Sequence, residues 1–434
     1  MNKDQNTHNI LESPIVNSYI TILYYLVHFH LLTRTALITL TDSVDSAYRA
    51  IRKGVERKHI KEHKTSTKIN GRTKSTTFFR ITSKGLNYLR DNYRLLPKEA
   101  WCVKELYTTE DGQKLILTET QPDKLIRFTN VSSSACLMFH AGAETKQLFL
   151  SGMDKNDDKQ PSKEDEEKNN TLRGTRLRCL NEIVNEAKEK FAAQEQTLNG
   201  YFSQPPENEF QFTNVFEVKQ LLAQKCGEHG NFIAGRYVGI AESPLKSVIV
   251  YVGNRAGMSW SAIATKPEFS AHHAFSAHIS PYKNLRAGEN HGIMLVDNVK
   301  MFADLFLDKH QKRGQKAFAD GFNSFHIFPF SKVGSEQICE FMFTDIREYE
   351  LALIEAAVHS GIYKKNEKGF TNLLPLVNEN GTPMAIGVFM DTIKLSHILT
   401  IRERIGAKFG IICYEWQIDF YRRVVPGTVF MTIG

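Results

Sequence analysis

Apolar residues recur at helical spacing near the start of the chain and predict two helices in succession. The first spans about residues 17–29, and its apolar face is Ile20, Leu23, Tyr24 and Val27. The second is short and covers residues 33–40, with Thr33 as its N-cap. Its expected inward residues are Ala36, Leu37 and Leu40.

A third helix is expected to begin near Ser43 and to carry a polar, largely basic face. The apolar stripe that the spacing predicts is Val44, Tyr48, Ile51 and Val55. The opposite face consists of Asp45, Ser46, Arg49, Arg52, Lys53 and Glu56. A helix, a short helix and a third helix with an exposed basic face follow one another in helix-turn-helix units.

The segment after the third helix has the pattern of a β-hairpin. Two threonine-rich runs flank Asn70-Gly71, a strong signal for a two-residue hairpin turn. A closing helix is expected to begin near Ile81, with Thr82 or Ser83 as its cap and Leu86 and Leu89 facing inward. The hairpin is basic on both strands, with Lys61, Lys64 and Lys68 on the first and Arg72, Lys74 and Arg80 on the second.

In this order of elements, and in the run Ile81-Thr82-Ser83-Lys84-Gly85-Leu86 after the hairpin, residues 13–93 resemble the winged helix-turn-helix superfamily. The resemblance implies that the third helix enters the major groove of DNA and that the hairpin contacts a phosphate strand or the minor groove. The DNA-binding residues that it implies are Ser46, Arg49, Arg52, Lys53, Lys64, Lys68, Arg72 and Lys74. Among these, Arg49, Arg52 and Lys53 would reach base edges, and the hairpin residues would contact phosphates. Some domains of this kind bind proteins instead.

The charge of the chain is concentrated in this same region. Residues 1–100 hold 17 Lys and Arg against 8 Asp and Glu, a net of +9, although the whole chain carries +7. Residues 49–84 hold 12 basic residues against Glu56 and Glu62. A confined basic patch is the electrostatic pattern expected for phosphate contact, although a solvated basic face has the same composition.

At about 150 residues per domain, the 434 residues predict two or three domains of a globular α+β protein. Residues 1–100 are expected to be the winged helix and residues 101–150 a helical connector with a helix over Asp123–Glu144. An acidic linker over residues 151–175 includes residues 154–170, which contain no hydrophobic residue. Residues 176–434 begin with an amphipathic helix over Leu177–Leu198.

The rest of residues 176–434 alternates strand-like and helix-like runs, which predicts an α/β domain with a mixed sheet. Residues 236–254 indicate a hairpin that turns near Pro244. Residues 291–310 and 383–405 each indicate a strand followed by a helix. Residues 323–330 and 408–425 are further strand candidates.

Candidate chemistry in the second half is sparse. A metal-dependent nuclease would need acidic residues at strand ends, and the candidates are Asp297, Asp391 and Glu415. Gln417 stands where such a site would have a lysine, so helix capping explains these acids better. The cluster His272, His273 and His278 lacks a neighbouring carboxylate or cysteine, so no metal and no cofactor is expected. Ser132–Ser134 have no base nearby and are expected on a helix surface.

The location of the protein follows from three negative features. The most apolar stretch, Tyr19–Leu32, is shorter than the roughly 20 residues that a membrane span needs. The first residues lack the basic and then apolar order of a signal peptide. The six cysteines are scattered without a CxxC pair. A protein of the cytoplasm, without membrane attachment, is therefore expected.

The whole chain also resembles the replication-relaxation family of Gram-positive plasmids and conjugative elements, on the runs "FTNVFEVKQLL", "AGRYVGIAES" and "VIVYVGNRAGMSW". The resemblance implies a sequence-specific protein that binds double-stranded DNA and controls transcription or replication of a mobile element. A homodimer is expected, because one such head reads only a few base pairs. The C-terminal domain would support dimerisation or bind an effector or a protein partner. A nuclease or replication-initiation enzyme, or a module that recruits proteins to DNA, is the alternative.

Overall fold

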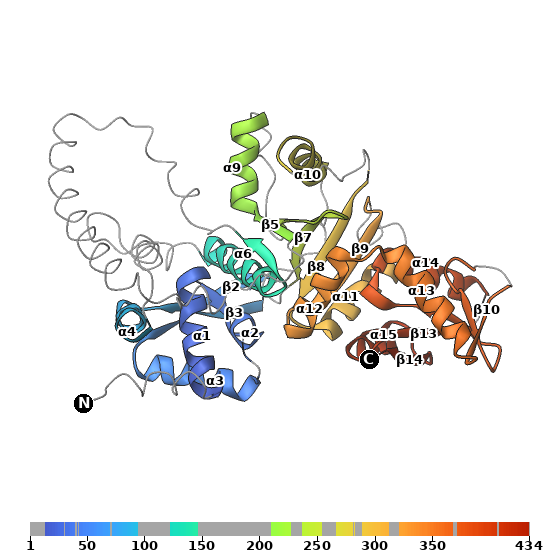
Figure 1. Ribbon diagram of the computed structural model, residues 1–434, viewed down its shortest axis with the longest axis horizontal. Coiled ribbons are helices and arrows are strands. Elements are labelled where there is room, and N and C mark those ends of the chain that lie inside the picture. Colours follow the sequence, from blue (N-terminus) through green and yellow to red (C-terminus); the bar gives the residue numbers. More distant parts are fainter. Residues whose placement is uncertain are drawn as a thin grey trace, which may run out of the picture. The chain divides into compact units, whose positions relative to one another are not determined.

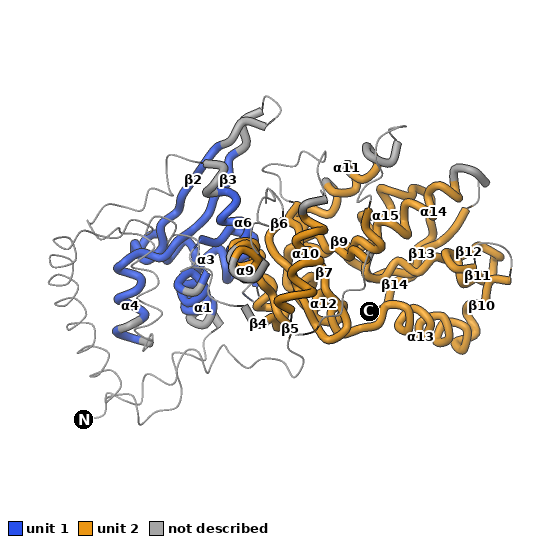
Figure 2. Tube along the Cα trace, turned by 90° about the horizontal axis from the view of Figure 1, so that it is seen from above, with its two compact units in different colours: residues 1–67, 75–133, 147–207 blue, residues 68–74, 134–146, 208–434 orange. Residues whose placement is uncertain are grey.

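The computed structural model describes residues 14–29, 31–39, 41, 43–69, 72–93, 122–145, 210–226, 237–253, 266–280, 282, 289–311, 321–367, 371–405 and 408–433. The chain divides into two compact units, which Figure 2 shows in different colours. Unit 1 comprises residues 1–67, 75–133 and 147–207, and unit 2 comprises residues 68–74, 134–146 and 208–434. Helices are combined with mixed sheets, as the sequence predicts for an α+β protein.

The first helices and the hairpin strands follow the predicted order, and the two-residue strand β1 is an element that the sequence did not predict (Figure 1). They are α1 (Pro14–Phe29), β1 (Leu32–Thr33), α2 (Arg34–Thr39), α3 (Val44–Glu56), β2 (Ile60–Ile69), β3 (Arg72–Ile81) and α4 (Ser83–Tyr93). The three strands form a small sheet in the order β1-β3-β2, with β1 antiparallel to β3.

The predicted helix caps are present in this segment. The Thr33 side chain accepts a hydrogen bond from the Ala36 amide at 3.2 Å, and the Ser43 side chain accepts one from Ser46 at 3.5 Å. Thr82, and not Ser83, caps α4, because its hydroxyl accepts a hydrogen bond from the Gly85 amide at 3.1 Å. These local bonds satisfy amides that have no partner inside their own helix.

Helix α1 is the centre of unit 1. It is apolar on almost every face, and α3 and α4 both pack against it. A helix that is hydrophobic all round must be covered on all sides, which explains this central position. Its fully or almost fully buried apolar residues are Tyr19, Ile20, Ile22, Leu23, Tyr24, Tyr25, Leu26, Val27 and Phe29.

Helix α6 (Pro122–His140) corrects two expectations. It ends before Glu144, because the chain continues into the short strand β4 (Ala143–Thr145). Ser132–Ser134 are buried and do not lie on the surface. Ser132 donates a hydrogen bond to the Phe29 carbonyl, and the Ser133 hydroxyl accepts one from the Thr33 amide at 3.1 Å. The hydroxyls of Ser132 and Ser133 bond the end of α1 and the start of α2, which allows these two side chains to be buried.

Unit 2 contains a six-stranded sheet in the order β4-β5-β6-β7-β8-β9. Its strands beyond β4 are β5 (Phe210–Asn214), β6 (Tyr237–Glu242), β7 (Ser247–Gly253), β8 (His291–Val296) and β9 (Ser324–Pro329). Strands β5, β6 and β7 pair antiparallel, whereas β7, β8 and β9 run parallel. The predicted hairpin and the predicted mixed sheet are therefore present. The connecting helices are α9 (Val215–Cys226), α10 (Lys266–His278), α11 (Val299–Gln311) and α12 (Lys332–Phe343).

The same unit contains a second mixed sheet, which the sequence analysis did not separate from the first. Its order is β10-β11-β12-β13-β14, antiparallel up to β12 and parallel from there. The strands are β10 (Tyr363–Lys365), β11 (Leu376–Asn378), β12 (Pro383–Ile386), β13 (Gly410–Tyr414) and β14 (Val429–Ile433). Helix α13 (Ile346–His359) covers a cluster formed by Tyr363, Leu376, Met384 and Ile412.

Two helices connect the second sheet to the first within unit 2. Helix α14 (Thr392–Ile405) follows β12 but packs against β9, and α15 (Ile418–Val424) packs against α11. The strand expected over residues 408–425 is thus only partly correct, because β13 ends at Tyr414 and the chain then turns into helix. Buried Phe420, Tyr421 and Val424 show the helical spacing that this part of the run contains.

Two expected segments, the acidic linker over residues 151–175 and the helix over Leu177–Leu198, lie outside the described residues. Among the helices that the structure does describe, none combines the length and the apolar character required to cross a bilayer.

Candidate functional site

Helix α3 presents the polar face that the sequence predicts. Asp45, Arg49, Arg52 and Glu56 are exposed, and Ser46 and Lys53 are partly exposed. The helix is amphipathic and begins at the Ser43 cap, so its position and direction are set by local sequence. The side chains of Arg49 and Arg52 therefore point away from the core of unit 1.

The inward stripe of α3 differs from the expected one. Of Val44, Tyr48, Ile51 and Val55, only Ile51 is buried, and Val44 and Tyr48 are 54% and 44% exposed. The residues that face inward are Ala47, Ala50, Ile51 and Gly54. Small residues are required there because the helix approaches its neighbours closely. A Cβ at Gly54 would lie 2.4 Å from the Ile60 side chain.

A tight turn connects α3 to the hairpin. Lys58 has a φ of 60°, the left-handed conformation that commonly ends a helix, and the His59 amide bonds the Gly54 carbonyl at 2.8 Å. Thr82 donates a hydrogen bond from its hydroxyl to the Lys58 carbonyl at 2.6 Å. The turn is therefore attached both to α3 and to the residue that caps α4, which fixes where the hairpin starts.

The hairpin places further cations beside this turn. Lys61 and Lys64 of β2 are exposed, and Lys64 Nζ lies 3.5 Å from a Glu62 carboxylate oxygen. Over residues 45–64 there are seven Lys and Arg against three Asp and Glu. Lys68 lies in β2, and Arg72 and Lys74 lie in β3, but their side chains are outside the described residues.

The cationic side chains of α3 differ in the contacts that they make within the protein. Lys53 Nζ lies 5.2 Å from the centre of the Tyr19 ring, a cation–π contact that engages its charge. Arg34, at the start of α2, lies in the same way over Tyr48, at 5.8 Å. Arg49 and Arg52, in contrast, make no hydrogen bond or ion pair with any residue that the structure describes. Their guanidinium groups are available to an external anion or base.

Two histidines at the start of the hairpin, His59 and His63, are uncharged near neutral pH. Burial lowers the pKa of His63 to about 4, and its ring stacks on Phe78. Burial also lowers the pKa of His59, whose Nδ1 lies 2.6 Å from the Tyr19 hydroxyl. Neither ring adds positive charge near pH 7, so the cationic face consists of lysine and arginine alone.

The three acids considered for a nuclease are not assembled into one site. Asp391 caps α14, with Oδ1 accepting a hydrogen bond from Ile393 at 2.9 Å, and Asp297 and Glu415 are exposed. Gln417 is buried, and its Oε1 accepts a hydrogen bond from the Tyr414 amide at 2.8 Å, so it has a local capping role. Within the described ranges, no group of three His, Cys, Asp or Glu is placed to hold a metal ion.

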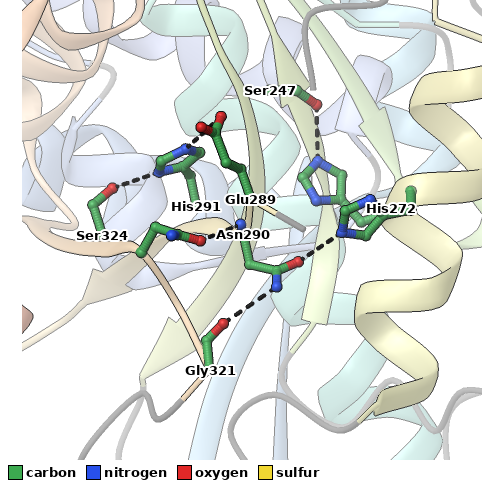
Figure 3. A network of polar contacts seen from close by, with 9 residues as sticks. Ser247, His272, Glu289, Asn290, His291, Gly321 and Ser324 are labelled. Atoms are coloured by element: carbon green, nitrogen blue, oxygen red, sulfur yellow. Dashed lines mark hydrogen bonds and ion pairs between the residues drawn. The ribbon is translucent and has the colours of Figure 1, made fainter. Parts of the chain in front are cut away.

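The histidine cluster on α10 is likewise divided among separate contacts (Figure 3). Buried His272 lies 2.8 Å from the Ser247 hydroxyl through Nε2, and burial lowers its pKa to about 3. His273 lies 3.0 Å from Oδ1 of Asn290 through its Nε2, and His278 is exposed. The three rings therefore do not converge on one point.

Unit 2 contains a cavity of about 470 Å³ between its two sheets, which the sequence did not predict. His291, Ser324 and His326, at the starts of two parallel strands, line it together with Asp391. His291 Nδ1 lies 2.9 Å from the Ser324 hydroxyl, and its Nε2 lies 3.9 Å from Glu289 (Figure 3). The sequence signals for this site were the histidine inside the apolar run of residues 323–330 and Asp391, which was considered above for a nuclease.

Comparisons with known proteins give no further guide to this chain. No family model, no curated protein and no solved structure matches it.

Proposed function

We propose that residues 14–93 form a winged helix-turn-helix domain that binds double-stranded DNA in a sequence-specific way. The observation that carries the proposal is the pair Arg49 and Arg52 on α3. Both are exposed, have no partner among the described residues, and lie three positions apart on one helix face. The order helix, strand, two helices, two strands and helix supports the assignment.

In this proposal α3 lies in the major groove and reads bases. Arginine bonds guanine through two donors, the commonest specific contact of this kind, and we assign this role to Arg49 and Arg52. Tyr48, which is exposed on the same helix, offers an apolar surface to a thymine methyl group. Ser46, in the first turn of the helix, and Lys53, held over Tyr19, are expected to contact the backbone near the groove.

The hairpin is assigned to phosphate contact. Lys64, Lys68, Arg72 and Lys74 flank its turn in sequence, and phosphate contacts set affinity and register without reading sequence. The chain would act in transcription or replication control of a mobile element, the role implied by its resemblance to replication-relaxation proteins. No cofactor and no metal is needed for this activity.

The salt dependence of binding tests the proposal. If about five cations meet phosphates, the logarithm of the affinity of the full-length protein for duplex DNA should fall with the logarithm of the salt concentration, with a slope of about −4 to −5. Fluorescence anisotropy with a labelled duplex measures the slope. Absence of binding at low salt, or an affinity that does not respond to salt, would refute it.

A homodimer is part of the same proposal. A single winged helix covers a small area of DNA, of the order of 600–1,000 Å², and reads few base pairs. Two-fold symmetry would double the site and space two half-sites by about one helical turn. Light scattering of the full-length protein, alone and with its preferred duplex, tests this; a monomer in both states contradicts it.

A further inference from the structure

The cavity in unit 2 has the size and lining of a small-molecule site. Its volume of about 470 Å³ lies within the range of roughly 300–1,000 Å³ typical of ligand pockets. The exposed residues Asp345 and Arg347 are part of its lining, so the cavity reaches the surface. Apolar side chains such as Val248, Phe341 and Leu395 form much of the remaining wall.

Two hydrogen-bond acceptors face one another in this cavity. An isolated antiparallel β-bridge joins His326 of β9 to Asp391, which precedes α14. Side chains of directly paired residues have Cβ atoms about 4.5–5.5 Å apart. Both residues line the cavity, so the bridge places an imidazole and a carboxylate side by side on its wall.

The ring of His326 contains a buried nitrogen that has no hydrogen-bond partner among the described residues. Its Nδ1 lies 2.8 Å from the Phe389 carbonyl, which can only accept a hydrogen bond, so Nδ1 carries the proton. Burial lowers the pKa of His326, which is only 1% exposed, and keeps the ring neutral. Nε2 is therefore an acceptor, and it has no hydrogen-bond partner among the described residues.

The carboxylate of Asp391 has no cationic partner in the described part of the chain. Its Oδ1 accepts hydrogen bonds from the amides of Ile393 at 2.9 Å and Phe325 at 3.3 Å, and no bond to Oδ2 is found there. The nearby lysines are engaged elsewhere. Lys246 donates to two carbonyls at the end of α12, and Lys394 bonds Glu350 at 2.6 Å.

The backbone next to Asp391 is strained in a way that supports a functional role. Phe389 has a φ of 59°, the left-handed region, although it is a buried aromatic residue. This conformation is unfavourable for a residue with a Cβ, and such residues concentrate at binding sites. The carbonyl of this same residue accepts the hydrogen bond that sets the tautomer of His326.

We propose that this cavity binds an organic cation, an ammonium or guanidinium group on an aliphatic body. The charged group would donate a hydrogen bond to Asp391 Oδ2, beside the neutral ring of His326, and the aliphatic part would lie against the apolar wall. A carboxylate or phosphate ligand at this position would be repelled by Asp391, and Glu289 also lines the cavity. Of the lining cations, Lys246 and Lys394 are already hydrogen-bonded and Arg347 is exposed. The proposal does not depend on DNA binding.

Three probes with one aliphatic body and different head groups test the charge requirement. Isothermal titration calorimetry on the full-length protein would compare isopentylamine, isopentanol and isovalerate, each up to millimolar concentration. We expect the amine to bind at least about tenfold more tightly than the alcohol, and isovalerate to show no binding. Equal affinity for all three, binding of isovalerate, or no binding of the amine would overturn the proposal.

Substitution of Asp391 tests the location of the site. Asp391→Asn keeps a side chain that caps α14 equally well but removes the negative charge, so it should weaken amine binding about tenfold or more. Glu355→Gln, which removes one charge from an exposed position of α13 outside the cavity, is the control and should bind as the unaltered chain does. An Asp391→Asn protein that melts normally and binds the amine fully would overturn the assignment; if this variant fails to fold, the three-probe comparison still decides.

Discussion

Truncation of Arg52 separates DNA binding from folding in a single substitution. Arg52 is exposed on α3 and makes no hydrogen bond or ion pair with any described residue. Arg52→Ala therefore removes no hydrogen bond or ion pair within the described part of the chain, and alanine is the strongest helix former. We expect the free energy of unfolding to change by no more than about 0.5 kcal/mol.

The same substitution should have a large effect on recognition. A two-donor contact from arginine to guanine contributes about 1–3 kcal/mol of discrimination, which corresponds to a roughly 5- to 150-fold loss of affinity for the preferred site. On random duplex Arg52 contributes only its charge, so the loss there should be smaller. Lys64→Ala, on the hairpin, should weaken binding to both duplexes by similar factors.

The assay begins with selection of the preferred site from a random duplex library by the full-length protein. Anisotropy titrations at one salt concentration would then compare selected and random duplexes for each variant. Arg422→Ala, which removes the same charge from an exposed position of α15 in unit 2, serves as the control. Equal losses on both duplexes for Arg52→Ala would show that α3 is not the recognition helix.

Three further predictions concern unit 2. Burial lowers the pKa of His272 from 6.5 to about 3. Between pH 3 and pH 6.5 this histidine is therefore protonated in the unfolded chain but neutral in the folded protein. Stability should thus fall by about 2 kcal/mol per such histidine from pH 7 to pH 5, and urea titrations should show a smaller pH dependence for His272→Gln; an unchanged dependence would contradict this. Gly334→Ala would place its Cβ 1.8 Å from the Pro329 carbonyl oxygen and should cost about 3 kcal/mol or more in thermal unfolding. Gly361→Ala, with open space around it, should cost only about 1 kcal/mol, and similar costs for both would refute the packing argument. Finally, the full-length protein should not cut DNA with Mg²⁺ or Mn²⁺ on gel assays, and cutting abolished by Asp391→Ala would restore the nuclease alternative.

Local sequence was sufficient for the elements of the first 93 residues. The caps Thr33, Ser43 and Thr82 bond amides only three residues away. The turn expected at Asn70-Gly71 lies outside the described residues. The exposure of Arg49 also followed from helical spacing. These features depend on near neighbours in the chain, which are visible in the sequence.

The direction in which α3 packs was decided by tertiary structure. Hydrophobicity favoured Val44 and Tyr48 as the inward residues, but the close approach of Ile60 requires small residues such as Gly54. The buried serines of α6 show the same limit, because Ser133 finds its partner in Thr33, far away in the sequence. A spacing pattern reports how apolar a face is and not how near its neighbour lies.

The cavity of unit 2 shows most clearly what only the tertiary structure decided. By itself, the sequence determined that His326 follows an apolar strand residue and that Asp391 precedes a helix, and both patterns are common. Only the packing of α14 from the second sheet onto β9 of the first brings the two side chains together. The sequence determines such local patterns because they depend on backbone preferences and caps, whereas a contact between distant segments depends on how whole sheets and helices exclude water and fill space.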